Sequence, residues 1–533
     1  MTTSAPRSAP PSAAPSAAAP TEGSPEGSAP DGPTEGFLHR FVGFARQHPD
    51  AVAIEALDEQ RRVSYAELHA LAQHRCAVLA SQNLPEGARV LLCLPTSVEL
   101  IAHYLATVGA GLVPVMINDK LTAAEFNALL QASQPALLVT TSALAQRHQS
   151  AWSGLAPLQA LITVDTPAER LSAPQVRCLD LPSQQHAPRA LRLPADDDIV
   201  TIQYTYKGLG EPLGVAHRYG SLTLSAHGLL QSMYPMGVGT VHLVGLPLYA
   251  VYGLLVLMVM PLSIGSTMLL TTTLSRQDIV DVLARHQVAF ACLVPELVRL
   301  IIHQLGERQA RGEAIPALHP QLMLYSGGSR LPVEVAEALA QRLPGYRVLQ
   351  GYGMTECLPV VLQSYVGASQ AGALGQVIPG AQVRVVDEDG QDVPSGTLGE
   401  LWIGGPTVTR GYLDNPEATR QFFTEGWIKS GDLVMQDAQG HIRFVGSRLR
   451  ITKVRSLMVD LAEVEQVARE LPTVRAARAH AERDALGQTS ILLSIVATDP
   501  EQTALQQHLV ARLSPHKQPR QIMVVHEAMA AAA

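Results

Sequence analysis

The stretch from residue 349 to residue 356, Leu-Gln-Gly-Tyr-Gly-Met-Thr-Glu, combines groups that could act on a phosphate-containing ligand. Gly351 and Gly353 have no Cβ, so the backbone there can pass close to a ligand. Thr355 offers a hydroxyl, and Glu356 offers a carboxylate able to hold Mg²⁺ beside phosphates. The alternation over residues 346–349 predicts a strand that ends in a Gly-Tyr-Gly turn at a sheet edge. An ordinary glycine-containing turn is the alternative interpretation.

A second glycine-rich segment follows another predicted strand. Residues 321–325 read as a strand that runs directly into Ser326-Gly327-Gly328-Ser329. A glycine pair after a strand allows close contact between the backbone and a flat ligand. The two segments together predict a binding crevice at the carboxyl ends of the central strands.

Composition limits the class of partner. Of the 533 residues 47% are hydrophobic and 16% are charged, and the formal net charge is −8, which gives no electrostatic reason to expect nucleic acid or an anionic membrane as partner. The five cysteines are scattered without CxxC spacing. We therefore expect a reduced, cytoplasmic protein with buried thiols and no zinc site. Cys357 has no identifiable histidine partner, so a nucleophilic role is not expected.

The order of predicted elements divides the chain into three parts. Residues 1–36 are mostly Ala, Pro, Ser, Gly, Thr and acids, which predicts a disordered tail. Residues 37–447 are expected to form a large N-terminal domain, because strands alternate with helices as in a helix over 97–110 followed by a strand over 112–117. Residues 373–446 carry short strands with Gly, Pro and Asp turns, which predicts an antiparallel, β-barrel-like subdomain. Residues 448–533 read as a small α+β domain.

The fold class is therefore α/β, with doubly wound sheets in the large domain.

Residues 243–273 contain no charged residue and are long enough to span a membrane. Pro247, Gly253, Pro261 and Gly265 interrupt the segment, so we expect a strand over 241–246, a helix over 252–260, a turn, and a strand over 266–270 in a protein core. No membrane span is expected.

With these segments identified, the chain resembles the ANL superfamily of adenylate-forming enzymes, which includes acyl- and aryl-CoA ligases, adenylation domains and luciferases. The resemblance covers about residues 37 to 527 and rests on the order and spacing of six stretches. They are Tyr325-Ser-Gly-Gly-Ser-Arg-Leu-Pro332, Gly351-Tyr-Gly-Met-Thr-Glu356, Gly375-Gln-Val-Ile-Pro-Gly380, Gly399-Glu-Leu-Trp-Ile-Gly-Gly-Pro406, Gly411-Tyr412 and Trp427-Ile-Lys-Ser-Gly-Asp-Leu433.

The resemblance implies a two-step reaction and a set of roles. A carboxylic acid would attack the α-phosphate of ATP, and the acyl group of the resulting adenylate would pass to the thiol of CoA or of carrier-protein phosphopantetheine. Thr355 would meet the α-phosphate, Glu356 would hold Mg²⁺, and Asp432 would bind the ribose hydroxyls. Two sets of residues would line the nucleotide site: Gly327, Gly328 and Ser329 beside the adenine, and Gly351, Tyr352 and Gly353 beside the adenine and acyl pockets.

The phosphate loop departs from the family pattern. Family members carry a Ser/Thr/Gly-rich loop that ends in Pro-Lys-Gly, whereas residues 204–215 read Tyr-Thr-Tyr-Lys-Gly-Leu-Gly-Glu-Pro-Leu-Gly-Val. Gly208 and Gly210 keep backbone amides available to phosphate oxygens, and Leu213 replaces the usual lysine. Lys207 is either a phosphate ligand from the other side of the loop or a solvated surface lysine. The first interpretation places it among the catalytic residues.

Three further departures concern the acyl pocket, the hinge and the C-terminus. Tyr249 and Ala250 stand where the family often has Phe-His. Ser447 occupies the position of a ribose-contacting arginine, for which Arg448 would substitute after a shift of one residue. The chain ends in Val-His-Glu-Ala-Met-Ala-Ala-Ala-Ala, without the family's Gly-Lys element, whose lysine drives adenylation.

Two functions stay open at this point. The chain is either a divergent ligase for an apolar aryl or fatty acid, with CoA or an acyl carrier protein as acceptor, or a protein of the same fold that lacks adenylation activity. The second would act as a binding or regulatory partner, or would catalyse only thiol transfer. The retained Thr355, Glu356 and Asp432 favour the ligase.

Overall fold

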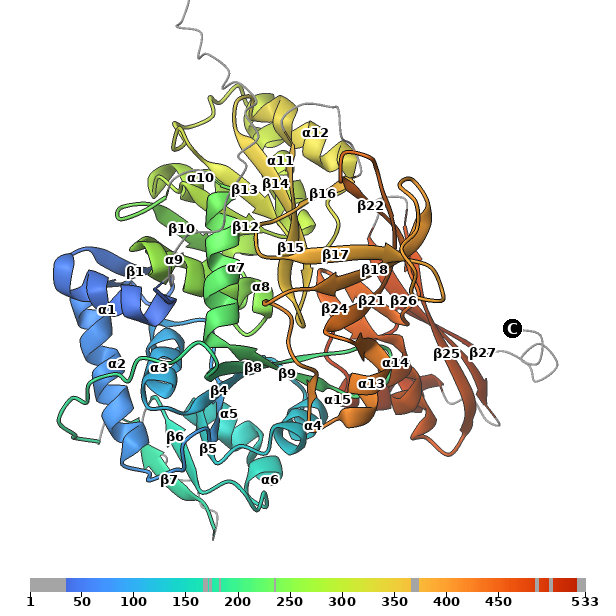
Figure 1. Cartoon of the computed structure of the whole chain (residues 1–533). Coiled ribbons are helices and arrows are strands. Elements are labelled where there is room, and N and C mark those ends of the chain that lie inside the picture. The colour runs from blue at the N-terminus through green and yellow to red at the C-terminus, as the bar shows by residue number, and fades with distance from the viewer. Residues whose placement is uncertain are drawn as a thin grey trace, which may run out of the picture. The chain divides into compact units, whose positions relative to one another are not determined.

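The computed structural model describes residues 35–165, 171, 175–181, 184–233, 236–365, 373–484, 488–497 and 502–524. The predicted disordered tail therefore lies outside the described residues except at 35 and 36, and so does the C-terminal end from residue 525. In the described part, the strands form two large sheets and two small ones (Figure 1). Among the described residues, no helix combines the length and apolar character needed to cross a membrane.

The first sheet has eight strands in the order β19-β9-β8-β4-β3-β5-β6-β7. The six strands from β8 to β7 pair in parallel, and the β8–β9 and β9–β19 pairs are antiparallel. Buried apolar runs explain the parallel part, since helices must cover both faces of such a sheet. The strands are β3 (Arg89–Cys93), β4 (Val113–Met116), β5 (Leu137–Thr140), β6 (Ala160–Thr163), β7 (Arg177–Asp180), β8 (Ile199–Thr205), β9 (Leu213–Arg218) and β19 (Tyr412–Leu413).

The second sheet has fourteen strands, of which thirteen follow one path, β17-β18-β21-β22-β16-β15-β14-β13-β12-β10-β11-β1-β2, and β20 pairs with β21. Its parallel half contains β1 (Val52–Ala56), β10 (Val241–Val244), β11 (Thr267–Leu270), β12 (Phe290–Leu293), β13 (Met323–Ser326) and β14 (Arg347–Met354), with β2 (Arg61–Ser64) antiparallel at the edge. Its antiparallel half contains β15 (Leu358–Tyr365), β16 (Ala373–Val377), β17 (Gln382–Val386), β18 (Leu398–Gly404), β20 (Phe423–Thr424), β21 (Trp427–Gln436) and β22 (Ile442–Ser447).

The antiparallel character predicted for residues 373–446 is confirmed. These strands continue the parallel sheet through the β15–β16 pair, and the described path is open at β17.

Helices cover the two large sheets and join their cores. One cluster of buried residues takes Leu92 from β3 together with Met268, Phe290 and Met323 from the second sheet, and α7 contacts both β9 and β15. The helices are α1 (Phe37–Gln47), α2 (Tyr65–Ala80), α3 (Val98–Gly109), α4 (Ala123–Ser133), α5 (Ser142–Arg147), α6 (Gln149–Trp152), α7 (Tyr219–Gln231), α10 (Ile279–Arg285), α11 (Pro295–Ala310), α12 (Val333–Arg342) and α13 (Pro416–Phe422), with a 3₁₀ turn η3 (Leu274–Arg276).

The uncharged segment forms a longer helix than predicted. Helix α8 (Val251–Leu254), a π-helical stretch η2 (Leu255–Val259) and α9 (Met260–Ile264) follow one another, so the helix does not stop before Pro261. The N–H of Met260 donates to the carbonyl of Leu255, and this wider turn lets the chain continue past Pro261, which has no N–H. The helix ends at Gly265, whose φ of 74° is the left-handed cap that glycine favours.

The predicted Gly-Tyr-Gly turn is wrong. Strand β14 runs through both glycines to Met354, because residues 348–354 pair with β15, and the turn comes at Thr355 to Cys357. A Cβ at Gly353 would collide with the carbonyl of Leu358, and one at Gly351 would collide with the Tyr325 hydroxyl. The glycines thus allow close packing of the strand against its own neighbours.

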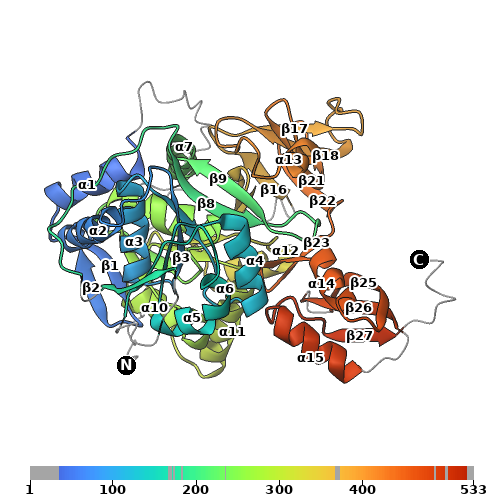
Figure 2. The same cartoon turned by 90° about the horizontal axis from the view of Figure 1, so that it is seen from below.

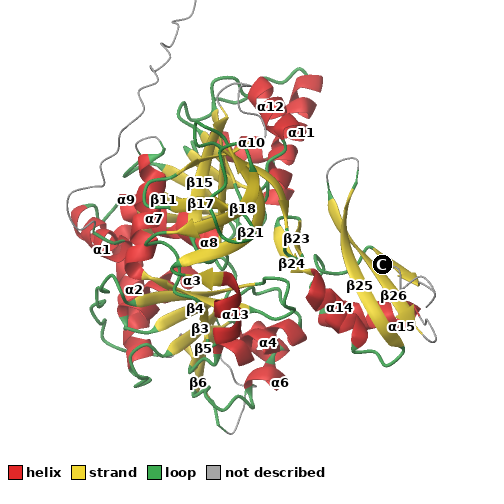
Figure 3. Ribbon diagram, turned by 45° about the vertical axis from the view of Figure 1, so that its right-hand side comes forward, coloured by secondary structure: helices red, strands yellow, loops and turns green. Residues whose placement is uncertain are grey.

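The C-terminal elements agree with the predicted α+β pattern, and Figure 3 shows them as a group of strands with two helices. They are the hairpin β23 (Ile451–Val454) and β24 (Leu457–Asp460), α14 (Leu461–Arg469), β25 (Val474–Arg483), β26 (Thr489–Ala497), α15 (Gln502–Arg512) and β27 (Gln521–Val524). Helix α14 and the sheet β25-β26-β27 enclose a core of their own. The boundary at residues 447 and 448 stays a prediction.

We expect Gly351→Ala to destabilise the protein by about 1–3 kcal/mol, because the added methyl group must displace the buried Tyr325 ring. The measurement is the free energy of unfolding in denaturant. Gly43→Ala is the matched control: no atom lies within 4 Å of a Cβ at this position in α1, so the substitution should stabilise by about 0.5–1 kcal/mol. Equal stability of Gly351→Ala and the wild type would contradict this packing argument.

Candidate active site

Strands β13 and β14 bring the two predicted glycine segments to the same sheet edge. Ser326 pairs with Gln350 in the parallel register, so residues 327–329 and 351–354 leave the pair side by side. The side chain of Gln350 accepts a hydrogen bond from the N–H of Leu331 at 2.8 Å, which ties the loop after β13 to β14. The predicted crevice residues from these two segments are thus neighbours.

Tyrosine rings of the protein occupy the space beside two of these glycines. A Cβ at Gly327 would collide with the ring of Tyr252, whose hydroxyl donates to the carbonyls of Leu293 (3.3 Å) and Tyr325 (3.2 Å). Gly328 has a φ of 77°, which glycine adopts without strain. Ser329, next in the loop, is partly buried. The glycine pair is therefore explained by a tyrosine-lined wall behind the loop.

The structure joins Tyr352 to Asp432, which lie 80 residues apart in the sequence. The Tyr352 hydroxyl donates to Oδ2 of Asp432 at 2.6 Å. Burial, followed by the neighbouring charge of Asp432, holds the pKa of Tyr352 well above its usual value, so the phenol stays a donor. Asp432 comes from β21, where it pairs with Ser447 of β22, and it is only partly buried. The Tyr352 hydrogen bond therefore holds the carboxylate of Asp432, the predicted ribose ligand, in a partly exposed position.

Glu356 lies in the turn between β14 and β15 and contacts Lys207. The Lys207 ammonium is 3.3 Å from Oε1 of Glu356, and the two side chains are 2% and 1% exposed. The hydroxyl of Tyr412 donates to the same oxygen at 2.6 Å, and the N–H of Thr409 donates to the Glu356 carbonyl at 2.8 Å. The interpretation of Lys207 as a solvated surface lysine is therefore wrong, because it is a buried partner of Glu356.

The second carboxylate oxygen of Glu356, Oε2, is buried and accepts no hydrogen bond within the described residues. A buried acceptor without a partner is costly unless a ligand or ion completes it. Among the described residues, no group of three or more His, Cys, Asp or Glu could hold a metal on its own. A site with one carboxylate suits Mg²⁺, which takes one or two carboxylates together with water and phosphate oxygens. The residues present therefore fit Mg²⁺ at Oε2.

Thr355 and Cys357 flank Glu356 in this turn. Thr355 is partly buried at the same edge. Cys357 is buried, and burial together with the charge of Glu356 raises the pKa of its thiol far above the usual value. A thiol held protonated is inert as a nucleophile, which agrees with the expectation from the sequence.

The phosphate-loop glycines face the C-terminal elements. Gly208 and Gly210 have φ values of 81° and 79°. The N–H of Gly210 donates to Oδ2 of Asp460 at 2.9 Å, and a Cβ at Gly208 would lie 3.2 Å from the backbone nitrogen of Arg450. Asp460 is fully buried and also caps α14 through Oδ1. The Asp460 carboxylate thus accepts the hydrogen bond of a backbone N–H that the sequence analysis assigned to a phosphate.

Lys517 connects the C-terminal elements to α4. Its ammonium is 2.8 Å from Oε1 of Glu125 in α4 and 2.8 Å from Oε1 of Glu463 in α14, and it lies 4.9 Å from the centre of the Tyr206 ring. Burial acts to lower the pKa of Lys517, but Tyr206 and the two carboxylates raise it above the usual value, so the cation is kept. Helices α4 and α15 are in contact, and Figure 2 shows α15 grouped with α14 and strands β25, β26 and β27.

Three further positions singled out from the sequence are Arg448, Tyr249 and Ala250. Arg448 is 46% exposed and pairs with Glu388, itself 87% exposed, at 3.4 Å, so it does not contact Asp432 through an ion pair in this arrangement. Ala250 is exposed and precedes α8, while Tyr249 is partly buried and its carbonyl accepts from Gln203 at 3.0 Å.

Several contributors were missed by sequence reasoning. Tyr412 was identified only as part of a Gly-Tyr pair, and its contact with Glu356 spans 56 residues. Asp460 was not singled out, although its place before an amphipathic helix is typical of an N-cap. Lys517 lies in the polar stretch Ser-Pro-His-Lys-Gln-Pro-Arg of residues 514–520, so its local sequence does not mark it as buried.

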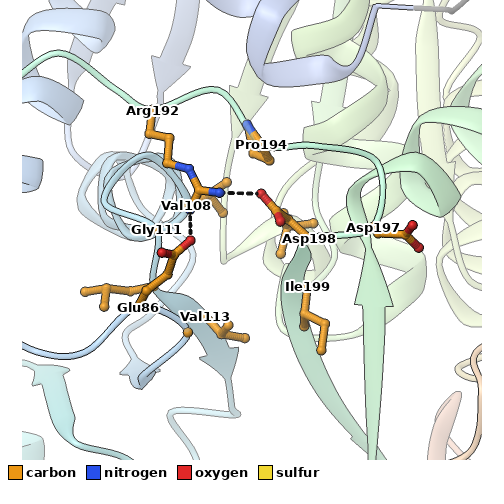
Figure 4. Close-up of a pocket in the computed structure, with 12 residues that line it drawn as sticks. Glu86, Val108, Gly111, Val113, Arg192, Pro194, Asp197, Asp198 and Ile199 are labelled. Atoms are coloured by element: carbon orange, nitrogen blue, oxygen red, sulfur yellow. Dashed lines mark hydrogen bonds and ion pairs between the residues drawn. The ribbon is translucent and has the colours of Figure 1, made fainter.

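A pocket elsewhere in the structure contains none of the predicted site residues. It is lined at the start of β4 and β8 by Val113 and Ile199, and Arg192 there bridges Glu86 and Asp198 (Figure 4). The predicted residues instead follow the ends of strands, as at Thr205 of β8 and Ser326 of β13.

The sequence matches the family model described as AMP-binding enzyme over residues 41–413. A curated relative, 4-hydroxybenzoate–CoA/benzoate–CoA ligase of Rhodopseudomonas palustris, is 28% identical over 484 residues, which cover 89% of this chain and 87% of the relative.

Two solved structures are similar in fold. A double mutant of o-succinylbenzoate CoA synthetase from Bacillus subtilis, bound with a product analogue, has a TM-score of 0.79 at 21% identity and covers 91% of this chain and 94% of that chain. A malonyl-CoA ligase in a ternary product complex with methylmalonyl-CoA and AMP has a TM-score of 0.71 at 26% identity and covers 89% of this chain and 96% of that chain.

We expect Lys517→Met to expose the loop around Gly210, because it leaves Glu125 and Glu463 as unpaired buried carboxylates. Hydrogen exchange at the Gly210 amide should become at least about ten-fold faster, since a tenfold change corresponds to about 1.4 kcal/mol and a broken buried pair costs about 3–5 kcal/mol. Arg512→Met removes an exposed cation paired with Glu470 and should leave this exchange unchanged. We call the ion pairs of Lys517 with Glu125 and Glu463 the Lys517 clasp. Unaltered protection of Gly210 in Lys517→Met would show that this clasp does not keep the loop covered.

Proposed function

Because the chain belongs to the AMP-binding enzyme family, we propose that it is an AMP-forming acid–thiol ligase. It activates a carboxylic acid as an acyl-adenylate and transfers the acyl group to a thiol. The observation that carries this proposal is the short segment from Tyr352 to Glu356, which contacts Asp432 at one end and presents the free Glu356 oxygen at the other. One segment thus holds the ribose acceptor Asp432 through Tyr352 at one end and carries a cation ligand, Glu356, at the other.

The residues of the crevice divide the work on ATP. Asp432 accepts hydrogen bonds from the ribose hydroxyls, and Tyr352 holds its carboxylate in place. Gly327, Gly328 and Ser329 flank the adenine, and Thr355 donates to the α-phosphate. Mg²⁺, held by Glu356 through Oε2, supplies positive charge next to the phosphates when bound. Fixed donors at the phosphate oppose the charge that develops when the acid attacks it.

The acid is an aryl or fatty acid, and the acceptor is CoA or an acyl carrier protein. Tyr252 belongs to the uncharged segment that forms α8, η2 and α9, and the rest of this segment is largely buried in the core, which favours an apolar acyl group. The curated relative acts on 4-hydroxybenzoate and benzoate, and its name specifies CoA. All five cysteines are free, which suits catalysis in the reducing cytoplasm.

The C-terminal part, residues 448–533, changes its position during the cycle. In the present arrangement Asp460 accepts the hydrogen bond of the Gly210 N–H. Lys517 holds the C-terminal elements against α4 through its ion pair with Glu125. The β- and γ-phosphates of ATP need that amide, so the C-terminal part must move away before ATP is fully bound. The arrangement in hand therefore suits the thiol-transfer step, after pyrophosphate has left.

The test is an ATP-dependent thioester assay read by mass spectrometry. Benzoate, 4-hydroxybenzoate and straight-chain fatty acids of increasing length are each offered with Mg²⁺ and either CoA or a carrier protein bearing phosphopantetheine. We expect AMP and one class of thioester to accumulate together. ATP binding without pyrophosphate release for any acid would instead support the alternative, a protein of this fold without adenylation activity.

We expect Asp432→Ala to weaken the binding of ATP and AMP alike by about ten-fold or more, because both nucleotides carry the ribose and a charge-assisted hydrogen bond is lost. Isothermal titration calorimetry measures both affinities. Asp389→Ala removes an exposed carboxylate from a turn and should bind both nucleotides as the wild type does. Unchanged affinity in Asp432→Ala would reject the ribose assignment.

Asp460→Asn should tighten ATP by up to about ten-fold and leave AMP unchanged, because asparagine has a single side-chain oxygen and cannot accept hydrogen bonds from both the Gly210 N–H and the cap of α14. Asparagine keeps an oxygen for the cap of α14, so the fold is preserved. The same calorimetric titrations decide the outcome, with Glu388→Gln as an exposed charge control. Equal effects on ATP and AMP would mean that Asp460 does not compete with the terminal phosphates.

A further inference from the structure

The phosphate-loop lysine faces into the protein. Lys207 follows β8, in the loop where the family pattern has small hydroxylated residues. Its ammonium is 3.3 Å from Oε1 of Glu356. The ring of Phe422 lies on another side, with its centre 5.6 Å from the ammonium. Both charged side chains are almost fully buried. A lysine that waits for a phosphate in solvent would not be enclosed in this way.

Two donors act on one oxygen of Glu356 and leave the other free. Lys207 and Tyr412 both contact Oε1, while Oε2 is buried and without a partner in the described structure. Tyr412 is held in place by the pairing of β19 with β9, opposite Val215. The carboxylate is thus oriented so that a single oxygen is presented to an incoming ion.

The pair also sets the charge of the site. A carboxylate alone would repel ATP and would attract a divalent cation, whereas an ammonium at 3.3 Å cancels its charge at close range. The pair therefore reduces both the repulsion of metal-free ATP and the attraction for a metal. Buried charges interact more strongly than exposed ones, so the effect is largest in an enclosed site such as this one.

We propose that Lys207 is a positioning residue that serves as a resident counter-cation of Glu356, so that ATP binding depends less on Mg²⁺ than it would with the carboxylate alone. This inference rests on the proposed function, since it assumes that ATP binds beside Glu356. It differs from a direct lysine–phosphate contact, because here Lys207 acts through the charge and orientation of the carboxylate.

The experiment is a double-mutant cycle on ATP affinity, measured by calorimetry with EDTA and with Mg²⁺. In EDTA, Lys207→Met should weaken ATP by about ten-fold or more, and Glu356→Gln should tighten it by a similar factor. The double variant Lys207→Met/Glu356→Gln removes both charges and should bind metal-free ATP as the wild type does. The ratio of the affinities with and without Mg²⁺ should rise in Lys207→Met and fall in Glu356→Gln.

The cycle separates the competing roles. If Lys207 touched phosphate directly, the double variant would bind metal-free ATP as weakly as Lys207→Met, and this result would overturn the proposal. Unchanged metal-free affinity in Glu356→Gln would overturn it as well. Should Lys207→Met fail to fold because it leaves a buried carboxylate unpaired, Glu356→Gln and the double variant still decide the question.

Tyr412→Phe removes the other donor to Oε1 without a change of charge, so the ratio of the affinities should stay within about two- to three-fold of the wild type. A wild type that binds ATP in neither buffer would reject the proposed function itself. A wild type that binds ATP, with no difference among the variants, would reject only the role of Lys207.

Discussion

A buried ion pair joins the two large sheets at the site. Lys207 belongs to the β8–β9 loop of the eight-stranded sheet, and Glu356 belongs to the β14–β15 turn of the fourteen-stranded sheet. Thr409 reinforces the junction, because its N–H binds the Glu356 carbonyl and its hydroxyl binds the carbonyl of Ala216 in β9 at 2.9 Å. A buried pair of this kind contributes little net stability, since the desolvation of two charges offsets their attraction. The pair instead fixes the position of one sheet relative to the other.

The arrangement of the candidate site residues depends on the relative position of the two sheets. Asp432 enters the site on β21, four strands along the path from β14, and reaches Tyr352 because β15, β16 and β22 continue the same sheet. The phosphate loop enters from the other sheet. A relative shift of the sheets would therefore separate Asp432 and Glu356 on one side from the loop amides on the other.

The sequence was informative where the cause is local and less so where it is distant. The strand at 112–117 and the helix at 97–110 were predicted to within a residue or two, because an apolar run and the Ser97 cap determine them. The Gly-Tyr-Gly segment was read as a turn because its partner strand β15 cannot be recognised from the segment itself. The helix end at Pro261 failed because a π turn depends on the packing around it. The partners of Lys207 and Asp432 were out of reach, since spacing along the chain does not reveal which side chains meet.

The contacts of the C-terminal part differ in how they respond to salt. The exposed pair of Arg448 and Glu388 stands in solvent, where mobile ions at physiological strength screen charges over roughly 8 Å. The Lys517 clasp is enclosed, with side chains 5% and 4% exposed for Lys517 and Glu125, so dissolved ions have little access to it. Raising the ionic strength thus loosens the connection at the hinge while the clasp on α4 keeps its strength. If the C-terminal part moves as proposed, the rate of its release is governed by the entry of water into the clasp and varies little with the ionic strength of the surrounding solution.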